Sequence, residues 1–151
     1  MSSEAKPLVT ILMADDDDED YMLTAEALHE ARILNPLCRV KDGEELMDYL
    51  SLKGEYSSRE KFPLPSLILL DLNMPRKDGR EALKEIEAHD ELRKIPVVVL
   101  TTSEAKEDIA KCYEIGANSY ITKPVTFDGL VKAFKALGQY WFEIVELPET
   151  S

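Results

Sequence analysis

The chain has 151 residues, of which 44% are hydrophobic, so it can build one sizeable core but not two domains. Its formal net charge of −12 argues against nucleic acid or an anionic membrane as its main partner. No apolar run approaches the roughly 20 residues of a membrane span, and residues 1–7 lack the hydrophobic core of a signal peptide. Its two cysteines, Cys38 and Cys112, lie far apart in apolar settings, which indicates reduced thiols. We therefore expect a cytoplasmic protein.

The first element expected is a buried strand that ends in acidic residues. Residues 8–14 are almost entirely apolar, without helical periodicity, and lead into six consecutive acids at residues 15–20. Apolar residues then recur at helical spacing up to residue 34, and Asn35-Pro36 is expected to stop that helix. The chain thus opens with a strand, an acidic loop and a helix.

The next strand and helix are shorter and are followed by a long connection. Residues 37–40 form a strand candidate, and Asp42-Gly43 turns the chain into a helix over residues 46–50. Residues 53–65 form a polar connection that is longer than most loops between a helix and a strand. We interpret it as a plain surface loop, with an interaction element as the alternative.

The third and fourth strands are the clearest in the chain. Residues 66–70 have the continuous apolar character of a strand buried on both faces, and this run ends abruptly at Asp71. A helix with its apolar residues at 82–86 follows. The β-branched run over residues 95–100 then predicts a fourth strand that ends at Thr101.

The last third of the chain predicts one more strand between two helices. Ser103 or Glu104 can cap a helix that Gly116 ends, and residues 119–122 form a strand that delivers Lys123. From Thr126 an apolar helical stripe runs to near the end. Five strands that alternate with five helices predict an α/β fold, a parallel sheet with helices on both faces.

Polar side chains gather at the carboxyl ends of these strands. Asp15 and Asp16 follow the first strand, Asp71 the third, Thr101 the fourth and Lys123 the fifth. Because ligands of open parallel sheets bind beyond the carboxyl ends of the strands, we expect these residues around one pocket. Carboxylates at such short distances repel one another unless a cation lies among them. Ligation by oxygen alone suits Mg²⁺ or Mn²⁺ far better than Zn²⁺.

This arrangement permits phosphoryl transfer to Asp71. A carboxylate beside a divalent cation can attack phosphorus and form an acyl phosphate, while the cation neutralises the developing charge. The candidate oxygen ligands besides Asp71 are Asp15, Asp16 and the backbone carbonyl of Asn73. Metal coordination and covalent chemistry would thus share one site.

Two further strand ends offer groups for the phosphoryl oxygens. Lys123 supplies a positive charge and Thr101 a hydroxyl donor, and Pro124 is a candidate cis peptide that points Lys123 inward. Each residue also has an ordinary explanation, with Asp16 as a helix N-cap, Thr101 as a strand-end residue and Lys123 as a solvated lysine. Their joint placement at four strand ends favours the chemical interpretation.

The order and spacing of these residues resemble a known family. The motifs are Asp15-Asp16, Asp71-Leu72-Asn73-Met74-Pro75, Val99-Leu100-Thr101-Thr102 and Lys123-Pro124. They resemble the receiver domain of two-component response regulators over nearly the whole chain. The resemblance implies a doubly wound, flavodoxin-like sheet with strand order 2-1-3-4-5, in a single receiver domain over residues 7–147 with flexible ends.

The resemblance also assigns roles. It implies that Asp71 is the phosphoacceptor, Asp15 and Asp16 the acidic pair that serves Mg²⁺, and the carbonyl of Asn73 a further metal ligand. Thr101 becomes the switch hydroxyl, Lys123 the phosphate-sensing lysine and Tyr120 the aromatic whose rotamer follows Thr101. Thr102 departs from the pattern, because receivers usually carry a smaller residue there, and this bears on phosphoryl access and lifetime.

A narrower resemblance points to a partner. Residues 23–28, 75–81, 98–103 and 140–142 are similar to the small single-domain response regulators paired with bacterial and cyanobacterial phytochromes. This similarity implies that the phosphoryl donor is a phosphohistidine on a red-light-sensing histidine kinase. No nucleic acid or membrane partner is expected.

We therefore expect a stand-alone response regulator that is not an enzyme with an external substrate. Asp71 would catalyse only its own phosphorylation and slow hydrolysis. One alternative is a scaffold that acts without phosphorylation. Another is an aspartyl-phosphate hydrolase of the haloacid type, but that chemistry requires a second Asp where this chain has Asn73.

The output is expected on the face built by the fourth helix, the fifth strand and the last helix. Tyr140, Trp141, Phe142 and Val145 place apolar residues on more than one side of the last helix and its extension. One stripe can be buried in the core, and the others favour a homodimer or kinase docking. A tail folded back on its own domain is the alternative.

Overall fold

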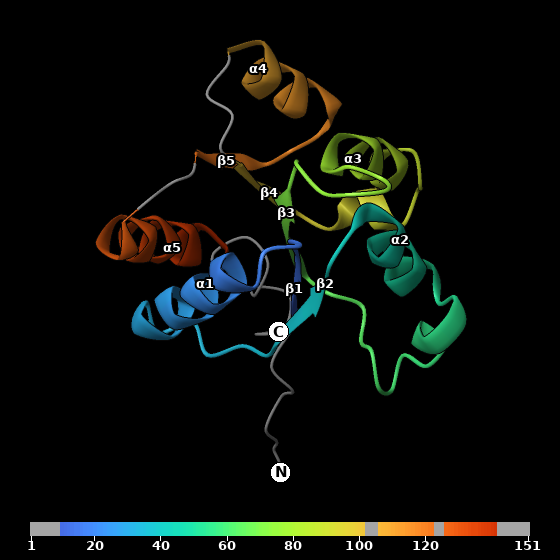
Figure 1. Cartoon of the computed structure of the whole chain (residues 1–151), viewed down its shortest axis with the longest axis horizontal. Coiled ribbons are helices and arrows are strands. Elements are labelled where there is room, and N and C mark those ends of the chain that lie inside the picture. The colour runs from blue at the N-terminus through green and yellow to red at the C-terminus, as the bar shows by residue number, and fades with distance from the viewer. Residues whose placement is uncertain (1–9, 102–105, 123–125, 142–151) are drawn as a thin grey trace, which may run out of the picture.

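The computed structural model describes residues 10–101, 106–122 and 126–141 (Figure 1). These residues form one five-stranded parallel sheet with the strand order β2-β1-β3-β4-β5. The strands are β1 (Ile11–Ala14), β2 (Leu37–Val40), β3 (Leu67–Asp71), β4 (Val97–Thr101) and β5 (Ser119–Thr122). The predicted strand order is confirmed, and β3, which delivers Asp71, is the central strand.

Helices cover both faces of the sheet. They are α1 (Asp18–Glu30), α2 (Gly43–Ser51), α3 (Gly79–Glu87), α4 (Lys106–Ile115) and α5 (Phe127–Trp141), with short 3₁₀ turns η1 (Gly54–Tyr56) and η2 (Leu92–Lys94). Figure 1 shows α1 and α5 side by side on one face, and α2 and α3 on the other. Within the described residues, no helix is long and apolar enough to cross a membrane.

The sheet separates two apolar clusters. Ile68 and Leu70 of β3 pack into a cluster with α2, α3 and α4, while Leu67 and Leu69 pack into a cluster with α1 and α5. Alternate side chains of a strand point to opposite faces, so a strand covered on both sides must be apolar at every position. This explains why residues 66–70 show no alternation of apolar and polar residues.

Aspartates fix the starts of the first three helices. The side chains of Asp17, Asp42 and Asp78 accept hydrogen bonds from backbone amides in the first turns of α1, α2 and α3. An N-cap of this kind satisfies amide groups that have no partner inside the helix. Each helix therefore begins at a defined residue beside the carboxyl edge of the sheet.

The first helix ends earlier than its apolar pattern predicts. The pattern extends to Leu34, but α1 ends at Glu30, and Arg32 adopts a left-handed φ of 67°. The amide of Ile33 then donates to the carbonyl of Leu28 at 2.9 Å. This closing bond, rather than Asn35-Pro36, stops the helix.

The connection over residues 53–65 is not a plain polar loop. Tyr56 is buried and Phe62 half-buried, and their ring centroids lie 4.9 Å apart beside Tyr49 of α2. Arg59 donates hydrogen bonds to the carbonyls of Tyr49 and Leu50 at the end of α2. The segment thus extends the core below α2, which the sequence conceals because its aromatic residues have no regular spacing.

Candidate functional site

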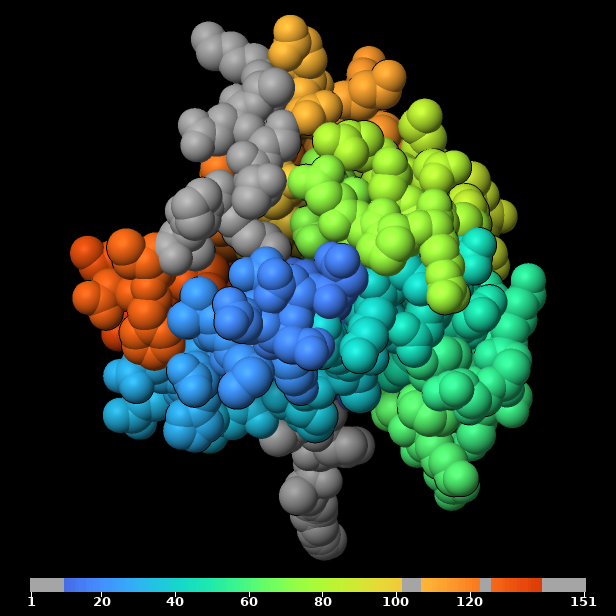
Figure 2. Space-filling model, in the orientation of Figure 1, coloured from blue at the N-terminus to red at the C-terminus, as the bar shows by residue number. Residues whose placement is uncertain are grey.

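Three carboxylates meet at the carboxyl edge of the sheet. Asp15, Asp16 and Asp71 each offer an oxygen, and these oxygens all lie within 4.8 Å of one another. Asp15 and Asp71 are buried, whereas Asp16 is exposed. The predicted proximity of the two strand ends is confirmed. In Figure 2 the blue first turn of α1 borders the green segment that follows β3 on this face.

The loop between β1 and α1 is fixed by its own aspartates. The backbone amide of Asp17 donates to Oδ1 of Asp15 at 2.9 Å. The side chain of Asp17 in turn caps α1, accepting from the amides of Glu19 and Asp20 at 2.8 and 3.1 Å. The interpretation of Asp16 as the helix N-cap is therefore wrong, because the cap lies one residue later. The carboxylate of Asp16 does not cap the helix and lies instead beside those of Asp15 and Asp71.

The loop between β3 and α3 packs tightly around Asp71. The amide of Asn73 donates to Oδ1 of Asp71 at 3.2 Å, and the amide of Gly79 donates to the carbonyl of Leu72 at 2.9 Å. A Cβ atom added at Gly79 would lie only 2.4 Å from the carbonyl oxygen of Asp71. A glycine is required here because helix α3 begins directly against the end of β3.

Thr101 and Tyr120 lie on neighbouring strands. Thr101 ends β4, is fully buried, and its Oγ1 accepts a hydrogen bond from Nδ2 of Asn73 at 3.3 Å. Tyr120 is half-buried in β5, and its ring centroid lies 6.5 Å from that of Tyr113 on α4. The structure therefore links Thr101 to the Asp71 loop through Asn73. The switch roles of Thr101 and Tyr120 stay predictions.

Several predicted functional residues lie outside the described part of the chain. Lys123 and Pro124 are among them, as are Thr102, Phe142 and Val145. Tyr140 and Trp141 belong to α5, but their side chains are not described. The roles predicted for all of these residues stay predictions.

One residue at the site was not predicted from the sequence. Arg39 of β2 reaches the acidic loop, where its Nε donates to the backbone carbonyl of Asp15 at 3.1 Å and its Nη1 pairs with Oδ1 of Asp18 at 2.7 Å. The contact with Arg39 and its positive charge hold the pKa of Asp18 below its usual value, and the charge of Lys41 adds a smaller effect in the same direction. The feature of the sequence that could have indicated Arg39 is a basic residue in a short, otherwise apolar strand.

The electrostatics of the cluster favour a bound cation. Two like charges about 5 Å apart repel by roughly 3 kcal/mol at an effective dielectric constant of about 20. The buried carboxylates of Asp15 and Asp71 are at most this far apart. Ligation by these oxygens fits Mg²⁺ or Mn²⁺, which prefer carboxylate ligands.

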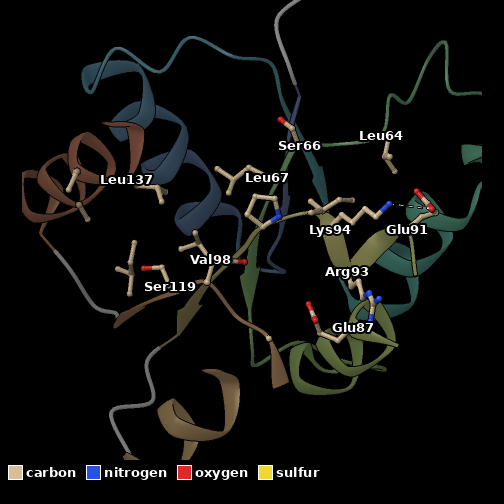
Figure 3. Close-up of a pocket in the computed structure, with 17 residues that line it drawn as sticks. Leu64, Ser66, Leu67, Glu87, Glu91, Arg93, Lys94, Val98, Ser119 and Leu137 are labelled. Atoms are coloured by element: carbon tan, nitrogen blue, oxygen red, sulfur yellow. Dashed lines mark ion pairs between the residues drawn. The ribbon is translucent and has the colours of Figure 1, made fainter. Parts of the chain in front are cut away.

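A hollow also lies at the opposite, amino edge of the sheet. It has a volume of about 850 Å³, and Leu67, Val98 and Ser119 border it beside Leu137 of α5 (Figure 3). Charged side chains stand at its rim, including the ion pair between Lys94 and Glu91 at 3.6 Å. None of the described residues that line it is predicted to take part in phosphoryl chemistry.

Comparison with known proteins agrees with the geometry of the carboxyl edge. The family model of the response regulator receiver domain matches residues 11–135. Response regulator Rcp1 from Synechocystis sp. is 43% identical over 148 residues, which cover 98% of this chain and 99% of Rcp1.

Solved structures agree as well. The phosphorylated cyanobacterial phytochrome response regulator RcpA superposes with a TM-score of 0.80 at 40% identity, over 89% of this chain and 94% of that one. The Mn²⁺-bound form of Rcp1 superposes with a TM-score of 0.79 at 42% identity, over 91% and 96% of the two chains.

Proposed function

Since the chain belongs to the receiver-domain family of response regulators, which act in phosphorylation-based two-component signalling, we propose that its phosphoacceptor is Asp71. The observation that supports this assignment is the cluster in which Asp15, Asp16 and Asp71 bring oxygens within 4.8 Å. Asp71 ends the central strand of the sheet, and the amide of Asn73 holds one of its oxygens. A carboxylate oxygen of Asp71 is the candidate nucleophile.

Receiver domains bind Mg²⁺ or Mn²⁺ at an acidic pocket, and the donor set of this chain suits such a cation. The residues that would hold it are Asp15, Asp16 and Asp71, with the carbonyl of Asn73 as the proposed fourth ligand. When bound, the cation supplies positive charge against the charge that develops on the phosphoryl oxygens.

The chain's own residues account for the covalent step. A carboxylate oxygen of Asp71 attacks phosphorus, the bond between phosphorus and the nitrogen of the donor phosphohistidine breaks, and the imidazole leaves. Lys123 is proposed to hold a phosphoryl oxygen. Receiver domains are generally not enzymes with an external substrate, and we propose that Asp71 acts only on its own phosphoryl group.

Thr101 is proposed to report the phosphorylation. In the structure its hydroxyl oxygen accepts from the side chain of Asn73, and the same hydroxyl can donate its proton to a phosphoryl oxygen on Asp71. We propose that this second hydrogen bond draws the Thr101 side chain away from Asn73 and opens space beside β5, into which Tyr120 turns. The surface formed by α4, β5 and α5 would then change.

The proposed donor is a sensor histidine kinase of the phytochrome type. Its support is the similarity to RcpA and Rcp1, of which RcpA is a phytochrome response regulator. A homodimer through α4, β5, α5 and the C-terminal extension is proposed as well, because Tyr113 and Phe127 expose large apolar side chains on α4 and α5. Sedimentation of a chain truncated after Gln139 tests the dimer, and an unchanged association state would contradict it.

Intact mass tests the phosphoacceptor directly. The full chain is incubated with Mg²⁺ and a small phosphodonor, and a gain of about 80 Da, one phosphoryl group, is expected. Asp71→Asn should show no gain, while the matched variant Asp90→Asn, at an exposed acid away from the cluster, should gain it as the wild type does. No gain in the wild type would favour the scaffold alternative. A gain that persists in Asp71→Asn would place the acceptor elsewhere.

A further inference from the structure

Arg39 connects the edge strand β2 to the acidic loop. It is in register with Met13 of β1, and its side chain therefore lies on the α1 face of the sheet. From there the guanidinium contacts two points of the loop, the carbonyl of Asp15 and the carboxylate of Asp18, and lies 4.9 Å from the ring centroid of Tyr21. One side chain thus joins the end of β1 to the first turn of α1.

The position is a costly one for an arginine. The side chain of Arg39 is only 14% exposed, and its Nη2 is buried without a hydrogen-bond partner among the described residues. A buried cation with an unsatisfied donor costs free energy, and an apolar residue of similar size is often at least as stabilising. Stability of the sheet alone therefore does not explain this residue.

The contacts of Arg39 explain better why an arginine occupies this position. The carbonyl of Asp15 belongs to the same residue whose Oδ1 accepts from the amide of Asp17, so that residue is held from both its backbone and its side chain. The ion pair between Asp18 and Arg39 holds the first turn of α1. Asp16 therefore lies between two residues, Asp15 and Asp18, that Arg39 contacts. The loop that presents Asp15 and Asp16 is therefore restrained on either side of Asp16.

We propose that Arg39 is a positioning residue for the cation site, holding the β1–α1 loop so that the carboxylates of Asp15 and Asp16 face Asp71 before the cation arrives. The inference rests on the proposed function only in taking these three carboxylates as the cation ligands. It also divides the acidic run by role. Asp15 and Asp16 serve the cation, Asp17 caps α1, and Asp18 anchors Arg39.

The direction in which cation affinity changes on loss of Arg39 distinguishes a positioning role from a purely electrostatic one. The positive charge of Arg39 repels a second cation nearby, so loss of that charge alone would strengthen cation binding. Loss of a positioning contact would weaken it instead, as loss of outer contacts to metal ligands generally does. The two roles therefore predict opposite changes in the dissociation constant.

The experiment measures Mn²⁺ binding to the unphosphorylated full chain, by electron paramagnetic resonance of the free ion. Arg39→Gln is expected to raise the dissociation constant about tenfold. Arg39→Lys keeps the charge but cannot span Asp15 and Asp18, so it should raise the constant nearly as much. Arg93→Gln, which removes the same charge from an exposed site at the opposite edge, should leave it unchanged. Tighter or unchanged binding in Arg39→Gln, or full rescue by lysine, would overturn the proposal.

A second variant keeps the test decisive if the Arg39 variants do not fold. Asp18→Asn removes an exposed anchor and retains the bond between Arg39 and Asp15, so Mn²⁺ affinity should fall less than in Arg39→Gln but more than in Glu19→Gln, which removes the same charge from the next, exposed residue. Equal affinities in Asp18→Asn and Glu19→Gln would count against the proposal. Because Mn²⁺ binding needs no phosphoryl transfer, a wild type that binds Mn²⁺ but gains no phosphoryl mass would contradict the proposed function alone.

Discussion

The two edges of the sheet are made by the same strands but present different chemistry. At the carboxyl edge, β1, β3 and β4 lead into Asp15, Asp71 and Thr101. At the amino edge, Leu67 and Val98 of the same sheet border a hollow of about 850 Å³, and none of its lining residues within the described part of the chain is predicted to act on phosphate. A large hollow is thus a weaker indicator of function than converging polar groups at strand ends.

The edges also differ in what their residues do for stability. The carboxyl edge holds carboxylates that repel one another, whereas at the amino edge Leu67 and Val98 join the core and charged side chains stand only at the rim of the hollow. Substitutions at the carboxyl edge should therefore separate function from stability. Substitutions at the amino edge should leave phosphoryl chemistry alone.

Gly79→Ala is expected to have the largest effect, because it strains the carboxyl edge itself. The added Cβ would lie 2.4 Å from the carbonyl oxygen of Asp71 and 2.7 Å from Cα of Leu72, and both are backbone atoms that cannot turn aside. The free energy of unfolding should fall by about 3 kcal/mol, which thermal or urea unfolding measures. Phosphoryl uptake should fall with it, because Asp71 moves.

Gly54→Ala is the matched control. Gly54, unlike Gly79, has a φ that disfavours other residues, +60°, but nothing lies within 4 Å of its added Cβ. Its cost should be about 1 kcal/mol, from backbone strain alone. Equal losses in the two variants would show that the contact between α3 and β3 is not the constraint.

Asp16→Asn should have opposite effects on binding and stability. Loss of one ligand should weaken Mn²⁺ binding at least about tenfold. Without divalent cation, loss of one of three neighbouring like charges should raise the free energy of unfolding by about 0.5 kcal/mol, and less at high salt. Urea unfolding with and without Mn²⁺ measures both, and Asp90→Asn is the control. A loss of stability in the metal-free variant would contradict the account of the cluster as repulsive.

Much of this site could be predicted from the sequence because its residues follow strands directly. Once residues 66–70 are recognised as a doubly buried strand, Asp71 must lie at its carboxyl end, and the same reasoning places Asp15 and Thr101. Arg39 could not be placed in this way. Its contact with Asp15 spans 24 residues and depends on β2 pairing with β1.

Local details of the fold were hidden for a similar reason. The end of α1 depends on a left-handed Arg32 and on the bond from Ile33 to Leu28, which no spacing of apolar residues reveals. The burial of Tyr56 depends on its packing against Phe62 and Tyr49. Sequence periodicity describes which face of an element is buried, but not where tertiary contacts end it.

Asn73→Ala is expected to have a moderate effect on the switch. The side chain of Asn73 holds Thr101 through a hydrogen bond of 3.3 Å, and its loss removes about 1 kcal/mol that favours the unphosphorylated arrangement. Affinity for beryllofluoride, a mimic of the phosphoryl group, should then rise about fivefold, as fluorescence or calorimetry can measure.

A double-mutant cycle tests whether Thr101 is the partner that matters. In a Thr101→Ala background, Asn73→Ala should change beryllofluoride affinity no further. A fivefold rise that persists without the Thr101 hydroxyl would show that Asn73 acts directly on the ligand or on Asp71.

Ala136→Arg is expected to have the smallest effect, and it tests the amino edge. Ala136 is an exposed residue of α5 that lines the hollow, so a long charged side chain can extend there without displacing the core. The free energy of unfolding should change by no more than about 0.5 kcal/mol. Mn²⁺ affinity and phosphoryl uptake from a small donor should stay at wild-type values, because no ligand contact has changed. A clear fall in either would mean that the hollow communicates with Asp71 through the strands, and the contrast between the two edges would then be wrong.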